Sequence, residues 1–408
     1  MGAWSRLGNP STAWDHVRVA HVISYSRLEA AGLDAGLDVV GICSAEPFED
    51  ARAVLEERRA AGLNGSMQFT YRKPARSTDP SVTLPGARML IAGACSYHRD
   101  PPEPPAGPGP VARVGRYVWA DHGARLHAGL DAIRAQLVEA GHRACVVSDQ
   151  NHLVDRPVAE RAGLGWFGKN ANILLPGHGS WFVLGTVITD AGPHHITDRP
   201  HPEPVPDGCG ACERCLPACP TGAILAPGVV DARRCLSWTL QAEGTIPREQ
   251  RAAVGDRIYG CDDCQEVCPP NRRELVRAAP DGRGTPVALG DPERAWVRVL
   301  GLLGSTDEEL LDRHGHWYIW RRDPRYLRRN ALVVLGNVGD GRDPAVVDAL
   351  RAALSGPDPL LRAHAVWCAK RLGCDDLLSL VAHDPDPDVR AELEAAPDLA
   401  PAAIPRVP

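Results

Sequence analysis

One run of twelve residues decides how the centre of this chain folds: Cys209-Gly-Ala-Cys212-Glu-Arg-Cys215-Leu-Pro-Ala-Cys219-Pro220. Its spacing, C-x2-C-x2-C-x3-C-P, is that of bacterial iron–sulfur proteins. A cubane cluster needs four thiolates that converge on one small volume. A short loop with cysteines three residues apart aims several of them at one centre, so the run predicts iron–sulfur chemistry.

A second run follows, Cys261-Asp-Asp-Cys264-Gln-Glu-Val-Cys268-Pro269, and it lacks the first cysteine of the pattern. Cys235, which lies between the two runs, can fill that vacancy. In two-cluster proteins the fourth cysteine of a run ligates the other cluster. We therefore predict two 4Fe–4S clusters in a ferredoxin-like arrangement. The first would be held by Cys209, Cys212, Cys215 and Cys268, and the second by Cys219, Cys235, Cys261 and Cys264.

Zinc and disulfide bonds are the alternative uses of these cysteines. A zinc ribbon needs two C-x2-C knuckles, and the first run carries more cysteines than one knuckle requires. Disulfides suit small secreted chains, whereas the stretch from Met1 to Trp14 lacks the apolar segment of a signal peptide. We expect a reducing, cytoplasmic location. We expect no membrane partner, because no apolar run approaches the ~20 residues of a membrane span.

The length of 408 residues suggests two or three domains, each able to bury its own core. The net charge of −6 gives no overall field that would recruit nucleic acid, so any such binding must come from a local basic patch. We expect a monomer.

Residues 1–205 predict an α/β domain, because short apolar strands alternate with helical patterns. The expected strands are Val39–Ile42, Arg88–Cys95, Ala144–Ser148 and Trp181–Thr189, and the expected helices include Ala51–Ala61 and Leu126–Ala140. Residues 206–280 form the predicted cluster domain, where little apolar sequence is available and the clusters must organise the fold.

Residues 281–408 predict an α-helical, HEAT-like repeat domain. Leu327-Arg-Arg-Asn-Ala331 recurs as Leu361-Arg-Ala-His-Ala365, and Asp-Pro precedes each unit. Helix pairs that repeat at an interval like that between Leu327 and Leu361 are typical of solenoids. Five arginines, Arg321, Arg322, Arg325, Arg328 and Arg329, form a basic strip at the start of the array. The strip is either a solvated face or a surface for phosphates.

The glycine-rich segment from Gly163 to Asn170 imitates two nucleotide-binding motifs. A phosphate loop requires Ser or Thr after the lysine, and here Asn170 follows Lys169. A dinucleotide fingerprint must follow a strand, but a helical pattern precedes this segment. We instead interpret it as a turn that lets the backbone approach a large, flat ligand.

Asp149 stands at the end of an expected strand, where ligands of open α/β sheets collect. The alternative is that Asp149 caps the helix that follows. The residue types alone leave both interpretations open.

Taken together, the chain resembles the epoxyqueuosine reductases, which are cobalamin-dependent iron–sulfur enzymes of tRNA modification. Three stretches carry the resemblance: Ala159 to Asn170, Gly179 to Asp190, and Arg257 to Pro269. With the Leu-Arg-Arg-Asn-Ala motif included, it covers nearly the whole chain in order. The chain departs from the family pattern at Asp121-His122-Gly123, where the family usually has Asp-Tyr-His, and over Trp317–Asp323.

The resemblance implies a specific reaction. Electrons from an external donor would pass through both clusters to cobalamin in the α/β domain, and epoxyqueuosine at the wobble position of tRNA would become queuosine. Cobalamin would lie near Gly168, Lys169, Asn170 and Trp181. The family's general acid stands thirteen positions before the Ala of Ala-Gly-Leu-Gly, and counting back from Ala162 reaches Asp149. The tRNA would lie on Arg325, Arg328 and Arg329.

Two other functional classes remain. One is a related cobalamin reductase that acts on a small molecule, for example by reductive dehalogenation, and it would not need the helical tail. The other is a ferredoxin-type electron-transfer protein, which would not need the segment from Asp149 to Asn170.

Overall fold

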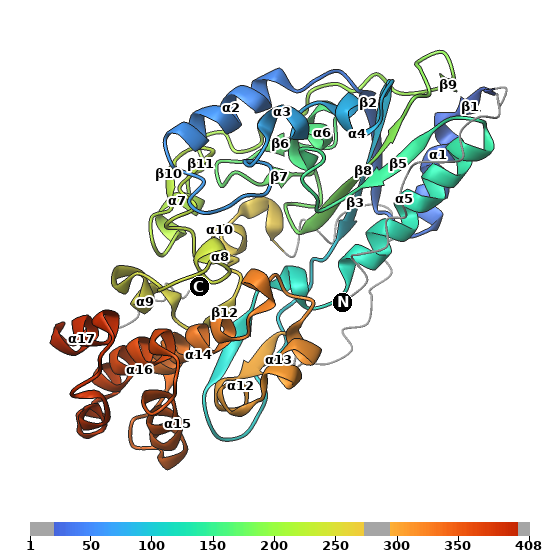
Figure 1. Ribbon diagram of the computed structural model, residues 1–408. Helices are drawn as coiled ribbons and strands as arrows, with labels where there is room; N and C mark the ends of the chain where they lie inside the picture. Colours follow the sequence, from blue (N-terminus) through green and yellow to red (C-terminus); the bar gives the residue numbers. More distant parts are fainter. Residues whose placement is uncertain (1–19, 273–293, 399–408) are drawn as a thin grey trace.

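The computed structural model describes residues 20–272 and 294–398. An α/β layer, a cysteine-bearing segment and a helical array follow one another across the molecule, with the cysteine-bearing segment in the middle (Figure 1). The predicted order of the three parts is confirmed. The boundary expected between residues 280 and 281 lies outside the described residues.

The main sheet has four strands in the order β2-β3-β8-β5, and every neighbouring pair is antiparallel. Its bounds are β2 Val39–Ser44, β3 Met89–Ser96, β8 Phe182–Thr189 and β5 Ala144–Val147. Helices α1 (Tyr25–Asp34) and α5 (His122–Glu139) cover one face, and α6 (Asp155–Arg161) packs on the other. Both faces are therefore buried, which is why β3 reads as a continuous apolar run.

Both sides of β3 carry core residues in strict alternation. Leu90, Ala92 and Ala94 belong to the core beneath α6, whereas Met89 and Ile91 belong to the core beneath α1 and α5. This alternation follows from the two-residue period of a strand. The other helices of this layer, α2 (Glu49–Ala60), α3 (Pro74–Ser77) and α4 (Pro80–Thr83), lie before β3.

A second sheet joins all three parts of the chain. The central strand β4 (Val111–Val114) pairs in parallel with β12 (Arg257–Tyr259) and antiparallel with β13 (Trp296–Arg298). Sequence patterns did not predict this sheet, because its strands are three or four residues long and lie far apart in the chain. It bridges the expected boundary near residue 205.

The helical array contains α12 (Val299–Gly304), α13 (Asp307–His314), α14 (Arg325–Val338), α15 (Pro344–Leu354), α16 (Pro359–Leu372) and α17 (Pro387–Glu394). The Asp-Pro pairs explain where several helices begin. Asp343, Asp358 and Asp386 each accept a hydrogen bond from a backbone N–H of the first turn, and a proline fills the next position. A helix tolerates proline there because that N–H has no partner within the helix.

Candidate active site

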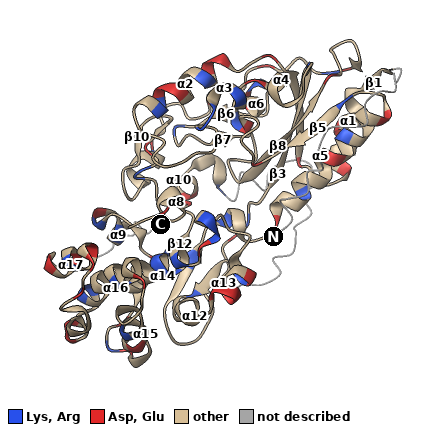
Figure 2. Cartoon of the chain, viewed as in Figure 1, with Lys and Arg blue, Asp and Glu red and all other residues tan. Residues whose placement is uncertain are grey.

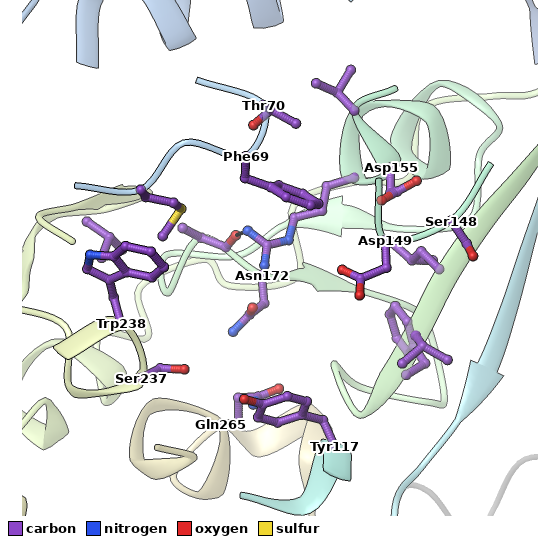
Figure 3. Close-up of a pocket in the computed structure, with 18 of the residues that line it drawn as sticks. Phe69, Thr70, Tyr117, Ser148, Asp149, Asp155, Asn172, Ser237, Trp238 and Gln265 are labelled. Carbon is purple, nitrogen blue, oxygen red and sulfur yellow. Dashed lines mark hydrogen bonds between the residues drawn. The ribbon is translucent and has the colours of Figure 1, made fainter. Parts of the chain in front are cut away.

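A cavity of about 3000 Å³ lies where the three parts of the chain meet. Small-molecule sites usually measure about 300–1,000 Å³, so this cavity has space for a cofactor and a further ligand together. Its walls come from the turn after β5, the loop that follows α2, the cysteine-bearing segment and the residues before α14. Figure 3 shows side chains from several of these walls pointing into the same space.

Asp149 lies on this wall, at the turn that follows β5. Its backbone is left-handed, with φ at +47°, a conformation that residues other than glycine rarely adopt. The carboxylate is exposed to the cavity, but protein atoms packed around it restrict its contact with bulk water. Burial therefore raises its pKa, and no other described group offsets that effect. Such a carboxyl group is better able to hold a proton near neutral pH.

The alternative interpretation of Asp149 as a helix cap is wrong. The next helix, α6, has Val154 at its N-cap and no side-chain hydrogen bond there. The left-handed turn at Asp149 instead points its side chain into the cavity (Figure 3). A strained backbone of this kind persists only where the surrounding structure enforces it, and such positions cluster at functional sites.

A second carboxyl group, Asp155, lies beside Asp149 and was missed in the sequence (Figure 3). One of its oxygens, Oδ1, is buried and has no hydrogen-bond partner among the described residues. Burial, together with the charge of Asp149, raises the pKa of Asp155 to about 8. The sequence did not point to Asp155, because an acidic residue in the first turn of a helix is common and needs no functional explanation.

The structure brings the eight cysteines together in the two predicted sets. Burial raises the pKa of Cys268 to about 12, and the nearby thiols of Cys209, Cys215 and Cys212 raise it further. Burial also raises the pKa of Cys264 well above its usual value, and here the contributing thiols are Cys261, Cys235 and Cys219. Because such electrostatic effects fall off with distance, Cys268 and Cys264 each lie close to the other three thiols of their own set.

The same geometry argues against the alternatives to clusters. All thirteen cysteines are described and none forms a disulfide. Within the described ranges, no group of three or more His, Cys, Asp or Glu side chains converges closely enough to hold a single metal ion. A zinc ion would require sulfurs about 3.8 Å apart, given Zn–S bonds of about 2.3 Å in a tetrahedron.

The two sets differ in position. Cys219, Cys235, Cys261 and Cys264 all line the cavity, and none of the other four does. We call the cavity-lining four the inner set and the others the outer set. Three cysteines of the outer set are partly exposed, whereas Cys268 is buried against Trp166 and Leu174. Ala223 donates its backbone N–H to Sγ of Cys219 at 3.1 Å, a contact that tunes iron–sulfur centres.

The expected cobalamin residues are only partly on the cavity wall. Asn170 lines the cavity, and its side chain donates to the carbonyl of Cys264 at 3.3 Å. Lys169 instead places Nζ 3.5 Å from Glu213, near Cys215 of the outer set. The prediction for Trp181 is wrong, because its side chain is fully buried and does not line the cavity. Its ring packs against Arg116, with 4.5 Å from the guanidinium carbon to the ring centroid.

Glycines of the segment from Gly163 to Gly168 serve internal packing. A Cβ atom at Gly165 would lie 2.1 Å from the carbonyl oxygen of Leu174, and one at Gly168 would lie 2.3 Å from the Leu174 side chain. The segment leads into the hairpin β6 (Trp166–Phe167) and β7 (Ile173–Leu174) rather than into a helix. The nucleotide motifs are therefore coincidental, as predicted, but the close backbone approach is to the chain itself rather than to a ligand.

Comparisons with known proteins agree with this geometry. Residues 208–271 match the model of the 4Fe-4S double cluster binding domain, and residues 318–396 match HEAT repeats. An epoxyqueuosine reductase of Bacillus cereus is 33% identical over 359 residues, which are 87% of this chain and 89% of that protein. One from Bacillus subtilis is 30% identical over 378 residues, 89% of this chain and 92% of that protein.

This chain belongs to the epoxyqueuosine reductases. It is therefore an oxidoreductase, and its double-cluster domain carries two 4Fe–4S clusters. A solved epoxyqueuosine reductase in complex with an epoxyqueuosine-modified stem loop of tRNA-Tyr superposes with a TM-score of 0.78 at 28% identity, covering 90% of this chain and 96% of that one. A Bacillus subtilis structure with its catalytic aspartate loop swung out of the active site gives the same values.

Only part of the basic strip is exposed at the surface. Figure 2 shows basic residues gathered at the start of α14. Arg321 and Arg322 are exposed, and Arg325 is exposed but paired with Asp323 at 2.6 Å. Arg328 is mostly buried and pairs with Asp307 at 2.5 Å. Whether Arg325 and Arg328 meet tRNA stays a prediction.

The prediction that Arg329 binds tRNA is wrong. Its side chain is fully buried, and it donates to the carbonyl oxygens of Ala242 at 2.7 Å and Gly244 at 2.6 Å. The neighbouring Asn330 donates to the carbonyls of Leu240 and Ile258. The Leu-Arg-Arg-Asn-Ala motif therefore fastens the helical array to the cysteine-bearing segment.

Among the described residues, no helix is both long and apolar enough to span a bilayer.

Proposed function

We propose that this chain reduces epoxyqueuosine in tRNA to queuosine, and that Asp149 supplies a proton to the departing oxygen. The overall change consumes two electrons and two protons, and the epoxide oxygen leaves as water. One observation carries the proposal: the unpaired carboxyl group of Asp149 opens onto the same cavity as the inner cysteine set. Family membership supports the substrate, since relatives are named for this reaction and one is described with a modified tRNA stem loop.

The two cysteine sets support a directed path for electrons. In this proposal the outer set, Cys209, Cys212, Cys215 and Cys268, holds the cluster that receives electrons from an external donor. None of these four lines the cavity, and the residues between them, such as Glu213 and Arg214, are exposed. The inner set, Cys219, Cys235, Cys261 and Cys264, holds the cluster that passes electrons into the cavity, because all four line it.

Cobalamin is the cofactor that we propose for the cavity. The volume fits a large cofactor beside a nucleotide, and the wall between Asp149 and the inner cysteine set carries amide and hydroxyl groups suited to a corrin's amide side chains. These groups belong to Asn170, Asn172, Ser237 and Gln265. When bound, cobalamin would supply a strongly nucleophilic reduced metal centre. Lys169, Gly168 and Trp181 would support this wall from behind rather than touch the cofactor.

The protein's own contribution to the chemistry is a controlled proton supply. Burial raises the pKa of Asp149 above its ordinary value, and Asp155, whose pKa rises to about 8, holds a proton beside it. A general acid works best when its pKa lies near the working pH. The relative with a catalytic aspartate loop that swings out supports a loop-borne aspartate as the acid, and Asp149 stands on such a turn.

The tRNA would enter from the side of the cavity that faces the helical array. Arg321, Arg322 and Arg325 are exposed there and suit phosphates. Arg328 can add to this field but is already paired. We further propose that the chain works as a monomer in the cytoplasm, since the cavity is completed by residues of one chain.

The test is an anaerobic assay of protein reconstituted with iron, sulfide and cobalamin. The substrate is tRNA that carries epoxyqueuosine, and the reductant is a low-potential chemical donor. We expect queuosine in nuclease digests of the tRNA, measured by mass spectrometry, and about eight irons per chain. Absence of queuosine with fully loaded, pre-reduced protein would contradict the proposed function.

A further inference from the structure

A pair of aromatic rings stands on the cavity wall, and the proposed reaction uses neither. Trp238, at the end of the short helix α8 (Leu236–Thr239), and Tyr318 have ring centroids 6.4 Å apart and planes inclined by 30°. Both line the cavity, and Tyr318 is 51% exposed. Figure 3 shows the indole ring of Trp238 across the cavity from Asp149. Large aromatic side chains left open in a cavity mark a binding surface.

The backbone that carries Tyr318 is held firmly. Its N–H donates to the hydroxyl oxygen of Tyr259 at 2.7 Å. The preceding residue, Trp317, stacks on the ring of Tyr259, with centroids 4.6 Å apart and planes inclined by 21°, and also lies against His314 at 4.4 Å. The backbone at Tyr318 is therefore fixed before a ligand binds, which lowers the entropy lost on binding.

Positive charge lies a few residues further along the chain. Arg321 and Arg322 are exposed, and both have left-handed backbones, with φ at +51° and +57°. Arg322 donates to the carbonyl oxygen of Gly315 at 3.0 Å, and within the described ranges no carboxylate pairs with either arginine. Stacking rings next to unpaired guanidinium groups match the two chemical parts of a nucleotide, a flat base and an anionic phosphate.

We propose that Tyr318 and Trp238 form a platform on which an unpaired RNA base next to the modified nucleotide stacks, while Arg321 and Arg322 contact the adjoining phosphates. The inference rests on the proposed function, because it assumes that tRNA enters this cavity. It adds a binding site for a second nucleotide.

The test uses the cofactor-loaded protein and a stem loop RNA with a fluorescent adenine analogue at one of the two positions that flank the modified nucleotide. We expect the analogue to be quenched by the wild-type protein at one of these positions. Tyr318→Ala should bind the RNA about 10-fold more weakly and lose the quenching, whereas Tyr318→Phe, which keeps the ring, should retain both. Leu380→Ala is the matched control, because Leu380 is 49% exposed and does not line the cavity.

The outcomes separate this inference from the proposed function. If Tyr318→Ala binds and quenches as the wild type does, the platform is disproved, while reduction of tRNA by the wild type would still stand. If Tyr318→Ala weakens cobalamin binding and leaves RNA affinity unchanged, the rings serve the cofactor and the inference is wrong. If the wild-type protein does not reduce the tRNA at all, the proposed function fails and the inference falls with it.

Discussion

Two charged side chains from sequence motifs have opposite surroundings. The carboxylate of Asp149 faces the cavity without a described partner, in a strained left-handed turn. The guanidinium of Arg329 is fully buried and donates six hydrogen bonds, all to atoms of the protein. A motif residue whose bonds are all satisfied internally serves the fold. One that is left unsatisfied beside a cavity is available for chemistry.

Arg329→Leu should have the largest effect. The change leaves several buried carbonyl oxygens without donors, and we expect it to lower the free energy of unfolding by at least about 3 kcal/mol. Thermal unfolding of the anaerobic protein measures this. Arg325→Leu is the matched control, because Arg325 is exposed and its ion pair should contribute less than about 1 kcal/mol. Equal losses in the two variants would contradict the contrast.

Asp149→Asn should show the reverse pattern, with turnover lost and the free energy of unfolding not lowered. We expect turnover to fall roughly 100-fold, the usual scale for a general acid, because asparagine cannot donate the proton. Single-turnover assays with pre-reduced protein isolate this step from electron delivery. Asp131→Asn, on the outer face of α5, is the control and should keep full activity. Normal turnover of Asp149→Asn with intact clusters would exclude the catalytic role.

The expected effect of changing Asp155 is smaller than that of changing Arg329 or Asp149. It concerns stability, and it should depend on pH. Burial, and then the charge of Asp149, raise its pKa from the ordinary 3.8 to about 8. The folded protein therefore keeps this proton while the unfolded chain releases it, so Asp155 reduces stability as pH rises through that window. Asp155→Asn removes the effect. Its stability relative to the wild type should be higher at about pH 8 than at about pH 5. A difference that does not change with pH would contradict this.

Arg325→Gln should have the smallest effect. If Arg325 contacts one phosphate of tRNA, its loss should reduce the slope of binding affinity against salt by about one. Arg342→Gln offers a comparison, because Arg342 is similarly paired, with Asp340 at 2.9 Å, but lies in the turn between α14 and α15, away from the basic strip. An unchanged slope for both would mean that Arg325 belongs to a solvated face.

Local spacing predicted much of this molecule. The cysteine runs predicted two sets of four thiols, because the geometry of a cubane cluster limits the loops that can hold it. The strand that ends before Asp149 and the solenoid that begins each unit at Asp-Pro were also predicted, since both rest on short-range periodicity and capping. These features depend on residues close together in the chain.

Features that depend on residues far apart were missed. Arg329 looked like a phosphate ligand, because its neighbours are basic and the carbonyls that receive its hydrogen bonds lie almost 90 residues earlier. Trp181 was predicted to contact the cofactor, but its side chain is buried in the α/β layer against Arg116. Asp155 was overlooked because its burial follows from the cavity wall. No local pattern reports such long-range contacts.

The central strand β4 also has a consequence for synthesis of the chain. Arg113 of β4 leaves the ribosome 144 residues before its partner Arg257 and 183 residues before Trp296. Until both have been made, β4 has unpaired edges of the kind that invite aggregation. Separate polypeptides for the helical array and the rest would leave one edge open permanently. We therefore expect gene fission between these parts to be selected against, even though each part resembles a module found elsewhere.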